Sequence, residues 1–250
     1  MNPQQYTGII IKKLQLTKTV FHFVIQNEKP STLDFEPGQY ATFFVDEKTR
    51  RQYSFCSPPN PTSFELVVDT SPMGTGSQYF LKLKEGEKVE FLAPLGKFTL
   101  SENSLKTIFI ATGAGIAPFR SMLLKVVHSS WFLDPKKKNN GLLSTNQEPG
   151  TMNLSLYWGL RFEDDVYWDS EFKALAGQYT GLQYFLSLSK PGENWHGLVG
   201  HVTDRVLEKE KNPQNCEFYL CGNSAMITEM KQRLSDIKVP QEQVKIDTFY

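Results

Sequence analysis

Cysteine is scarce in this chain of 250 residues, which contains only Cys56, Cys216 and Cys221. Three thiols are too few for a disulfide framework. They are also too few for a four-thiolate iron–sulfur cluster, and no C-x4-C-x2-C spacing occurs. A Cys216–Cys221 disulfide is not expected, because five residues of extended strand would separate the Cα atoms by about 16 Å, beyond the ~7 Å limit. Any redox cofactor should therefore be organic, and the compartment reducing.

An excess of one charge and long apolar runs are also missing. The 27 basic residues balance the 27 acidic ones, so no global field favours nucleic acid or an anionic membrane as a partner. No apolar run reaches the ~18 residues of a membrane span, and the polar start MNPQQYTG is unlike a signal peptide. We therefore expect a cytoplasmic protein, monomeric by default, with neither of these partners, and no motif predicts a metal site.

The first hundred residues read as antiparallel β structure. Short runs rich in β-branched and aromatic residues are separated by turn signals such as EPG, SPPNP and KEGE. One amphipathic stretch, SQYFLKL, predicts a single helix among them. Six strands at this spacing favour an antiparallel β-barrel, which we assign to residues 1–101. The predicted strands are 7–17, 20–26, 39–46, 51–57, 64–70 and 88–96.

Predicted strands and helices alternate in the rest of the chain. Such alternation favours an α/β domain with a doubly wound parallel sheet, which we assign to residues 102–250. The polar segment 134–150 predicts a loop. Strands are expected at SLKTIFIATGAG, NLSLYWGLR, LQYFLSLSKP and CEFYLCGN, and helices at APFRSMLLKVVHSSWF, WDSEFKALAGQY, HVTDRVLEKE and SAMITEMKQRLSDI.

Two motifs in the barrel carry chemistry. Arg51-Gln52-Tyr53-Ser54, followed by Ser57, combines a phosphate-holding guanidinium, a ring that can cover a flat ligand and a hydroxyl that can reach a ring nitrogen. Its alternative is an ordinary strand with an exposed arginine. Gly74-Thr75-Gly76-Ser77 opens the predicted helix, where backbone N–H groups suit a pyrophosphate; its alternative is a glycine turn with a Ser N-cap.

Two further motifs follow strands of the parallel sheet. In Thr112-Gly113-Ala114-Gly115-Ile116-Ala117-Pro118, glycines allow close approach of a pyrophosphate, the helix dipole favours an anion, and a first-turn proline is tolerated. The alternative is a plain tight turn. Cys221-Gly222-Asn223-Ser224-Ala225-Met226 follows an apolar strand, where a lone cysteine is usually a small buried residue.

These motifs, in this order, resemble those of the ferredoxin–NADP(H) reductase family over roughly residues 6 to 250. There R-x-Y-S is the flavin motif, G-x-x-S binds the FAD pyrophosphate, T-G-x-G-[IV]-[AT]-P binds the nicotinamide nucleotide, and C-G-x-x-x-M places a cysteine beside the nicotinamide. The chain also ends, like bacterial members, in an acid before two aromatic residues, so Asp247 is a further candidate at the flavin.

The resemblance implies a set of site residues. Catalytic roles fall to Ser54, Cys221 and Tyr250. FAD would be bound by Arg51, Gln52, Tyr53, Ser54, Ser57, Val67, Val68, Thr70, Gly74, Thr75, Gly76, Ser77, Phe249 and Tyr250. NADP(H) would be bound by Thr112, Gly113, Gly115, Pro118, Arg161, Ser189, Lys190, Cys221, Gly222 and Met226.

The nucleotide preference stays open. Arg161 and Lys190 can grip a 2′-phosphate, which favours NADP(H). Three neighbouring acids, together with His201 where bacterial relatives often carry arginine, leave NAD(H) as the alternative. The acids are Glu163, Asp164 and Asp165.

The implied activity is hydride transfer between nicotinamide C4 and flavin N5, then one-electron exchange with a ferredoxin or flavodoxin. Alternatives are an NADH-dependent reductase component of an oxygenase system and a free-flavin reductase. A flavin-less binding subunit is the alternative of another class.

Overall fold

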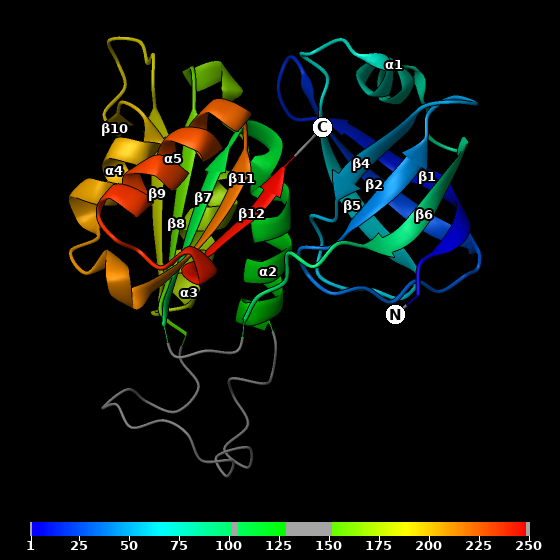
Figure 1. Ribbon diagram of the computed structural model, residues 1–250. Helices are drawn as coiled ribbons and strands as arrows, with labels where there is room; N and C mark the ends of the chain where they lie inside the picture. Colours follow the sequence, from blue (N-terminus) through cyan, green and yellow to red (C-terminus); the bar gives the residue numbers. More distant parts are fainter. Residues whose placement is uncertain (1, 102–104, 129–151, 249–250) are drawn as a thin grey trace.

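The computed structural model describes residues 2–101, 105–128 and 152–248, which fold around two six-stranded sheets (Figure 1). The first sheet and helix α1 (Thr75–Lys82) are called the barrel half below, and the second sheet with its helices the parallel half. The predicted loop 134–150 lies outside the described residues. The boundary proposed at residue 101 falls between the last strand of the first sheet and the first strand of the second.

The barrel half is an antiparallel sheet with strand order β4-β3-β6-β1-β2-β5. Period-two burial explains its core, since alternate side chains of a strand face the same side; Ala41 and Phe43 are the inward residues of β3. A bridge from Phe55 to Leu66 brings the first strand of this order to the last, so the sheet curls closed. All six predicted strands are present: β1 (Gln4–Gln15), β2 (Val20–Lys29), β3 (Tyr40–Phe44), β4 (Arg50–Ser54), β5 (Ser63–Asp69) and β6 (Lys88–Leu95).

The parallel half confirms the doubly wound α/β prediction, with strand order β10-β9-β8-β7-β11-β12. Every position of β11 is buried, as expected for a parallel strand covered on both faces. Its strands are β7 (Lys106–Thr112), β8 (Leu154–Leu160), β9 (Leu182–Leu188), β10 (Leu198–Val199), β11 (Cys216–Gly222) and β12 (Val244–Thr248). Its helices are α2 (Ala117–His128), α3 (Asp169–Gln178), α4 (Val202–Lys209) and α5 (Ser224–Asp236), with 3-10 turns η1 (Gly113–Ile116), η4 (Glu163–Asp165), η5 (Pro213–Asn215) and η6 (Gln241–Gln243).

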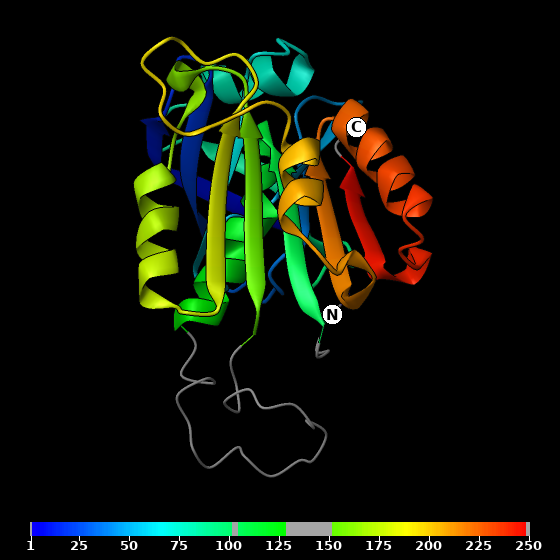
Figure 2. The same cartoon turned by 90° about the vertical axis from the view of Figure 1, so that its left-hand side faces the viewer.

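Two strands of this sheet were not predicted from the sequence. The pattern missed β10, which has two residues, and β12, whose residues VKIDT are all half-buried and carry two charges. Figure 2 shows β12 in red at one edge of the sheet. Its pairing with β11 sets Asp247 beside Cys221, so this missed strand matters for the site.

Helix α2 joins the two halves. It lies between the two sheets (Figure 1) and, together with α3, packs on the sheet face opposite α4 and α5. One apolar core includes Cys56 and Val67 from the barrel half together with Ile116, Phe119 and Met122 from the parallel half. The halves therefore share a continuous interface. None of the helices in the described ranges combines the length and hydropathy that crossing a bilayer requires.

Candidate functional site

The predicted flavin motif on β4 faces the start of helix α1. Arg51 and Tyr53 are two residues apart, so they share one face of the strand. A Cβ placed on Gly76 would lie 2.5 Å from the Tyr53 hydroxyl and 3.0 Å from Arg51 Cγ. Glycine therefore lets the first turn of α1 lie directly against these two side chains. Burial raises the pKa of Tyr53 to about 12, opposed by the Arg51 charge, so its hydroxyl stays protonated at neutral pH.

Hydrogen-bond donors without anionic partners lie close together at the first turn of α1. The Arg51 guanidinium donates to the Arg50 carbonyl at 2.8 Å, and within the described ranges no carboxylate pairs with it. Gly74 caps α1 without a side-chain hydrogen bond, and a Cβ built on it would meet no atom within 4 Å. First-turn N–H groups that lack side-chain caps attract anions. The arrangement fits a pyrophosphate, as the motif predicts.

The opposite end of α1 is held by Lys13 from β1. Its Nζ donates to the carbonyls of Phe80, Leu81 and Leu83 at 3.1, 2.7 and 2.7 Å. A cation at a helix C-terminus satisfies the free carbonyls and complements the dipole. Lys13 thus anchors the helix whose first turn faces Arg51 and Tyr53.

Ser54 links the two halves of the protein. It is the last residue of β4 and 4% exposed, and its hydroxyl donates to Asp247 Oδ2 of β12 at 3.3 Å. Burial raises the pKa of Asp247, and the Ser54 hydrogen bond opposes that shift. Tyr40 pairs with Ser54 across the sheet, and burial together with the Asp247 charge raises the pKa of its hydroxyl.

Cys221 lies beside Asp247 in the register of β11 and β12. It is fully buried, and this burial, followed by the Asp247 charge, raises the pKa of its thiol. A thiol kept neutral is a poor nucleophile. The geometry therefore suits a residue that positions other groups. All three cysteines are free, in line with the prediction that Cys216 and Cys221 do not bridge.

The two nucleotide motifs of the parallel half contact each other. Gly222 has φ +142°, and a Cβ on it would clash with the Thr112 hydroxyl, while one on Gly115 would clash with the Cys221 carbonyl. Asn223 donates to Thr112 Oγ1 from its backbone N at 2.9 Å and from Nδ2 at 3.0 Å. These motifs form one surface at the carboxyl ends of β7 and β11, where open α/β sheets bind ligands.

This surface has an open face at Gly113. Its φ is +55°, and a Cβ placed on it would meet no atom within 4 Å. Trp158 Nε1 and the Tyr167 hydroxyl donate to its carbonyl at 3.0 and 3.3 Å, which holds the turn in place. At the far end of the motifs, Met226 N–H donates to Asn223 Oδ1, which caps α5. Pro118 is buried in the first turn of α2. The rigid, glycine-lined turn fits a nicotinamide nucleotide.

Basic and acidic residues mix beyond the ends of β8 and β9. Lys190 N–H donates to the Arg161 carbonyl at 2.9 Å, and both side chains are exposed. A Cβ on Gly192 would lie 3.1 Å from the Glu163 carboxylate, so an acid lies on the same loop surface. His201, at the N-cap of α4, is also exposed. Ser189 N–H donates to the Leu160 carbonyl at 3.0 Å.

Other predicted FAD residues use their side chains for contacts within the protein. The Ser57 hydroxyl accepts from Glu65 N–H at 3.1 Å, and Thr70 donates to the Thr19 carbonyl at 2.7 Å. Val67 and Val68 are buried in apolar cores. A ligand would therefore meet backbone groups in this region. Of the remaining predicted residues, Gln52 and Thr75 are exposed, Ser77 is buried, and Phe249 and Tyr250 lie outside the described residues.

Two residues of the site were missed from the sequence. Tyr40 directly follows the turn Pro37-Gly38-Gln39, but nothing in the pattern pairs it with Ser54. Asn223 precedes the predicted helix of residues 224–237, and asparagine at that position is an N-cap signal. That signal could have assigned Asn223 to the helix start, although not to Thr112.

Two family profiles match neighbouring parts of the chain. The profile described as "Oxidoreductase FAD-binding domain" matches residues 8–100, and "Oxidoreductase NAD-binding domain" matches residues 109–232. The first covers the barrel half and the second most of the parallel half. The chain therefore has domains for FAD and for a nicotinamide nucleotide.

The chain spans about half the length of the curated relatives it matches. One of them, a subunit of the Na(+)-translocating NADH-quinone reductase of Klebsiella pneumoniae, is 29% identical over 224 residues, covering 82% of this chain and 50% of the relative. The corresponding reductase subunit of Neisseria meningitidis is 28% identical over 221 residues, with the same coverage.

Solved structures show the same fold. An Amycolatopsis cytochrome P450 reductase superimposes with a TM-score of 0.82 at 21% identity, covering 98% of this chain and 70% of that one. A ferredoxin NADP+ reductase from Neisseria gonorrhoeae with bound FAD and NADP has a TM-score of 0.74 at 18% identity, covering 99% of both chains.

Proposed function

Because this chain belongs to the ferredoxin–NADP(H) reductase-like family of two-domain flavoprotein oxidoreductases, we propose that it is a reductase that passes electrons from NADPH through FAD to a small redox protein. The observation that carries the proposal is the meeting of the two motif sets. Ser54 of the flavin motif bonds to Asp247, which lies beside Cys221 of the nucleotide motif. Both cofactors would therefore converge on one interface.

The chemistry that FAD supplies when bound is acceptance of hydride from a nicotinamide and release of single electrons. The chain's own residues would bind and orient. Arg51 and the first turn of α1 would hold the pyrophosphate, and Tyr53 would lie against the ring system. The Ser54 hydroxyl would hold a hydrogen bond at the reacting edge.

Asp247 and Cys221 complete the proposed site. Because its pKa is raised, Asp247 takes up a proton more readily than an exposed carboxyl. It can then exchange the roles of donor and acceptor with Ser54 across their 3.3 Å contact. The buried neutral Cys221 would keep water away from this hydrogen bond. The aromatic pair Phe249 and Tyr250 stays a proposal as a cover for the flavin.

NADPH is proposed as the donor on the strength of a basic pair. Arg161 and Lys190 are joined through their backbones and have exposed side chains. Within the described chain neither has a carboxylate partner. Guanidinium and ammonium groups placed this way suit the 2′-phosphate that distinguishes NADPH from NADH.

NADH is the second candidate. Glu163 lies on the same loop surface, and a carboxylate repels a 2′-phosphate while it can bond to a ribose hydroxyl. The curated relatives are also described as NADH-quinone reductase subunits. The two donors leave the reaction class unchanged.

A ferredoxin or flavodoxin is proposed as the acceptor. These 250 residues contain too few cysteines for a four-thiolate cluster, so the proposed one-electron acceptor would lie outside them. Structural neighbours described as ferredoxin reductases support this choice. A quinone-linked or oxygenase-linked acceptor would be reached through the same flavin.

Anaerobic stopped-flow mixing tests the proposal. The purified holoprotein is mixed separately with NADPH and with NADH while the flavin absorbance is followed. Fast bleaching by NADPH and slow bleaching by NADH are expected. Fast bleaching by NADH alone would replace the donor but keep the reductase. A flavin signal that neither nucleotide bleaches would overturn the function.

The site assignment needs a variant pair. Ser54→Ala should slow flavin reduction roughly 10- to 100-fold, because one hydrogen bond at the reacting edge is lost. Ser170→Ala, an exposed serine in the first turn of α3, is the matched control and should reduce flavin at the wild-type rate. Equal rates in both variants would remove Ser54 from the site.

A further inference from the structure

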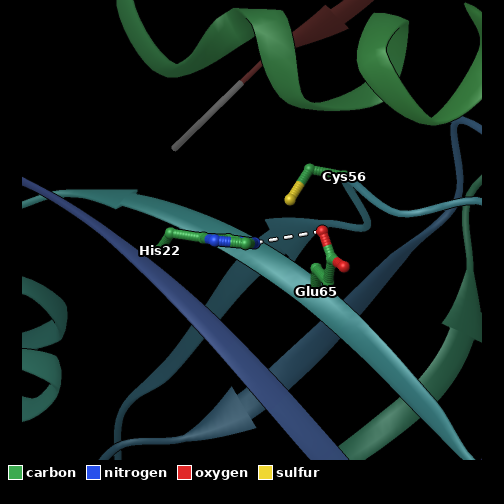
Figure 3. Close-up of side chains that lie close together, drawn as sticks. All are labelled: His22, Cys56 and Glu65. Atoms are coloured by element: carbon green, nitrogen blue, oxygen red, sulfur yellow. Dashed lines mark hydrogen bonds and ion pairs between the residues drawn. The ribbon is translucent and has the colours of Figure 1, made fainter. Parts of the chain in front are cut away.

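Three side chains with metal-ligating atoms converge at the edge of the barrel half. His22 of β2, Cys56 after β4 and Glu65 of β5 each offer one ligand atom, and these atoms all lie within 4.8 Å of one another. Figure 3 shows His22 and Glu65 facing each other with the Cys56 sulfur beside them. The His22 Nε2 to Glu65 Oε2 distance is 3.0 Å. By residue type alone, the cluster resembles a cation site.

A positively charged side chain of the protein, Arg120, already lies at this cluster. Arg120 of α2 reaches the cluster, and its Nη1 donates to Glu65 Oε2 at 2.7 Å and to the Cys56 carbonyl at 2.8 Å. Its Nε donates to Glu171 of α3 at 2.9 Å, and the guanidinium lies 4.4 Å from the centre of the Trp168 ring. The Arg120 side chain is only 11% exposed, so this charge is held in place from several sides.

The charges explain why the cluster is an ion-pair centre. Burial alone would raise the pKa of Glu65, but hydrogen bonds from His22 and Arg120 outweigh it and lower that pKa to about 2. Burial raises the pKa of the Cys56 thiol, which therefore stays neutral. A divalent ion would face a permanent guanidinium charge and a protonated thiol. Both disfavour metal binding.

The Arg120 contacts cross from one half of the protein to the other. Arg120 and Glu171 belong to the parallel half, whereas Glu65 and the Cys56 carbonyl belong to the barrel half. The next residue, Ser121, is fully buried and donates from Oγ to the Ser57 carbonyl. Two consecutive residues of α2 thus bond to two consecutive carbonyls of the barrel half.

These carbonyls lie close to both motifs in the chain. Cys56 and Ser57 come two and three residues after Ser54, where β4 ends. Helix α2 directly follows the η1 turn of the nucleotide motif. The two hydrogen bonds therefore connect the flavin motif and the nucleotide motif through a few residues of backbone.

We propose that Arg120 and Ser121 are positioning residues that set the nucleotide-binding turn at its working distance and angle from Ser54. This rests on the proposed function. A displacement of about 1 Å between reacting groups can cost roughly 100-fold in rate. Two directional hydrogen bonds and a half-buried ion pair resist such sliding better than apolar contacts, which have no preferred direction.

The choice of variants follows from the charges. Removing Arg120 would leave two carboxylates without their cation, which can unfold the protein. The double variant Glu65→Gln with Ser121→Ala is milder. It weakens the contacts of these residues between the halves and, within the barrel half, the contact of Glu65 with His22. Glu171→Gln is the matched control, because Glu171 also pairs with Arg120 but lies in the same half of the protein. The two carboxylate side chains are equally exposed, at 28% for Glu171 and 29% for Glu65.

Stopped-flow flavin reduction is the first readout. For the double variant we expect a rate constant roughly 10- to 100-fold below wild type. FAD content and nucleotide Kd should stay within about twofold, since the hydrogen bonds of the Glu65 and Ser121 side chains go neither to the first turn of α1 nor to η1. Glu171→Gln should stay within about twofold of wild type in all three. A wild-type rate in the double variant, or an equal loss in Glu171→Gln, overturns the proposal while the function stands.

Hydrogen exchange of the same holoproteins is the second readout and needs no turnover. The backbone amides of α2 should exchange faster in the double variant than in wild type and in Glu171→Gln, because α2 loses bonds to the barrel half. Unchanged exchange in the double variant overturns the proposal. Should the wild type fail to reduce its flavin with either nucleotide, the proposed function falls, and hydrogen exchange alone then decides whether Arg120 and Ser121 hold the halves together.

Discussion

Gly76→Ala should separate FAD binding from folding. Gly76 lies in the first turn of α1, where alanine has a better helix propensity than glycine by about 0.5–1 kcal/mol. The new Cβ would lie 2.5 Å from the Tyr53 hydroxyl and 3.0 Å from Arg51 Cγ. Ordinary contacts are about 3.5–4.0 Å, so the Tyr53 hydroxyl must move by roughly 1 Å. Both neighbours are side chains that can swing aside, so the fold should survive.

The expected loss is in FAD affinity. Displacing Arg51 and Tyr53 weakens a hydrogen bond to a charged group, worth about 1.5–3 kcal/mol. Since 1.4 kcal/mol is tenfold in Kd, FAD should dissociate roughly 10- to 100-fold more readily. The apoprotein should unfold at the same temperature as wild type or slightly higher. Titration of apoprotein with FAD, followed by flavin fluorescence, measures the first; thermal unfolding of the apoprotein measures the second.

Gly177→Ala provides the control. It lies in α3, where a Cβ would meet no atom within 4 Å, so it carries the propensity change without the displacement. It should bind FAD as wild type does. Wild-type FAD affinity in Gly76→Ala would refute the assignment of this cradle. A loss of apoprotein stability in Gly76→Ala that Gly177→Ala does not share would refute the reasoning on side-chain mobility.

Three more predictions concern the parallel half. Gly222→Ala, at φ +142° and against Thr112, should lower the free energy of unfolding by roughly 2–4 kcal/mol in urea titrations; an unchanged midpoint would contradict the close packing. Arg161→Ala with Lys190→Ala should raise the KM for NADPH at least roughly tenfold and leave that for NADH unchanged, whereas equal changes for both donors would dismiss the 2′-phosphate role. In the folded protein the pKa of Asp247 is raised above its ordinary value of 3.8. The protonated carboxyl therefore contributes stability that is fully present below pH 3.8 and is lost as pH rises through the folded pKa. Asp247→Asn should remove this loss. If the free energy of unfolding of both proteins changed equally with pH across that window, the prediction would be rejected.

Local pattern was enough for the architecture of this protein. Alternating burial in strands such as VFHFVIQ and the continuous apolar run CEFYLCG carry their fold information within a few residues, because each strand type is set by which of its faces is covered. The glycine turns were visible for the same reason. Gly76, Gly115 and Gly222 mark places where backbone or side chains approach too closely for a Cβ.

The contacts of the site required the tertiary structure. Strand β12 has no strong pattern of its own, and only its pairing with β11 brings Asp247 to Cys221 and to Ser54, which is 193 positions away in the chain. Arg120 illustrates the same limit, since a helical arginine is normally a solvated surface residue.

The sequence by itself determined the two kinds of sheet, the order in which they follow along the chain, and the glycine turns for which we propose phosphate binding. Periodicity and glycine act over short distances along the chain, which is why these features could be predicted. Only the tertiary structure decided which charges are buried together. Packing of α2 between the sheets turns Arg120 into the centre of an ion-pair network that joins the halves, because the desolvation of its partners depends on groups from β2, β5 and α3.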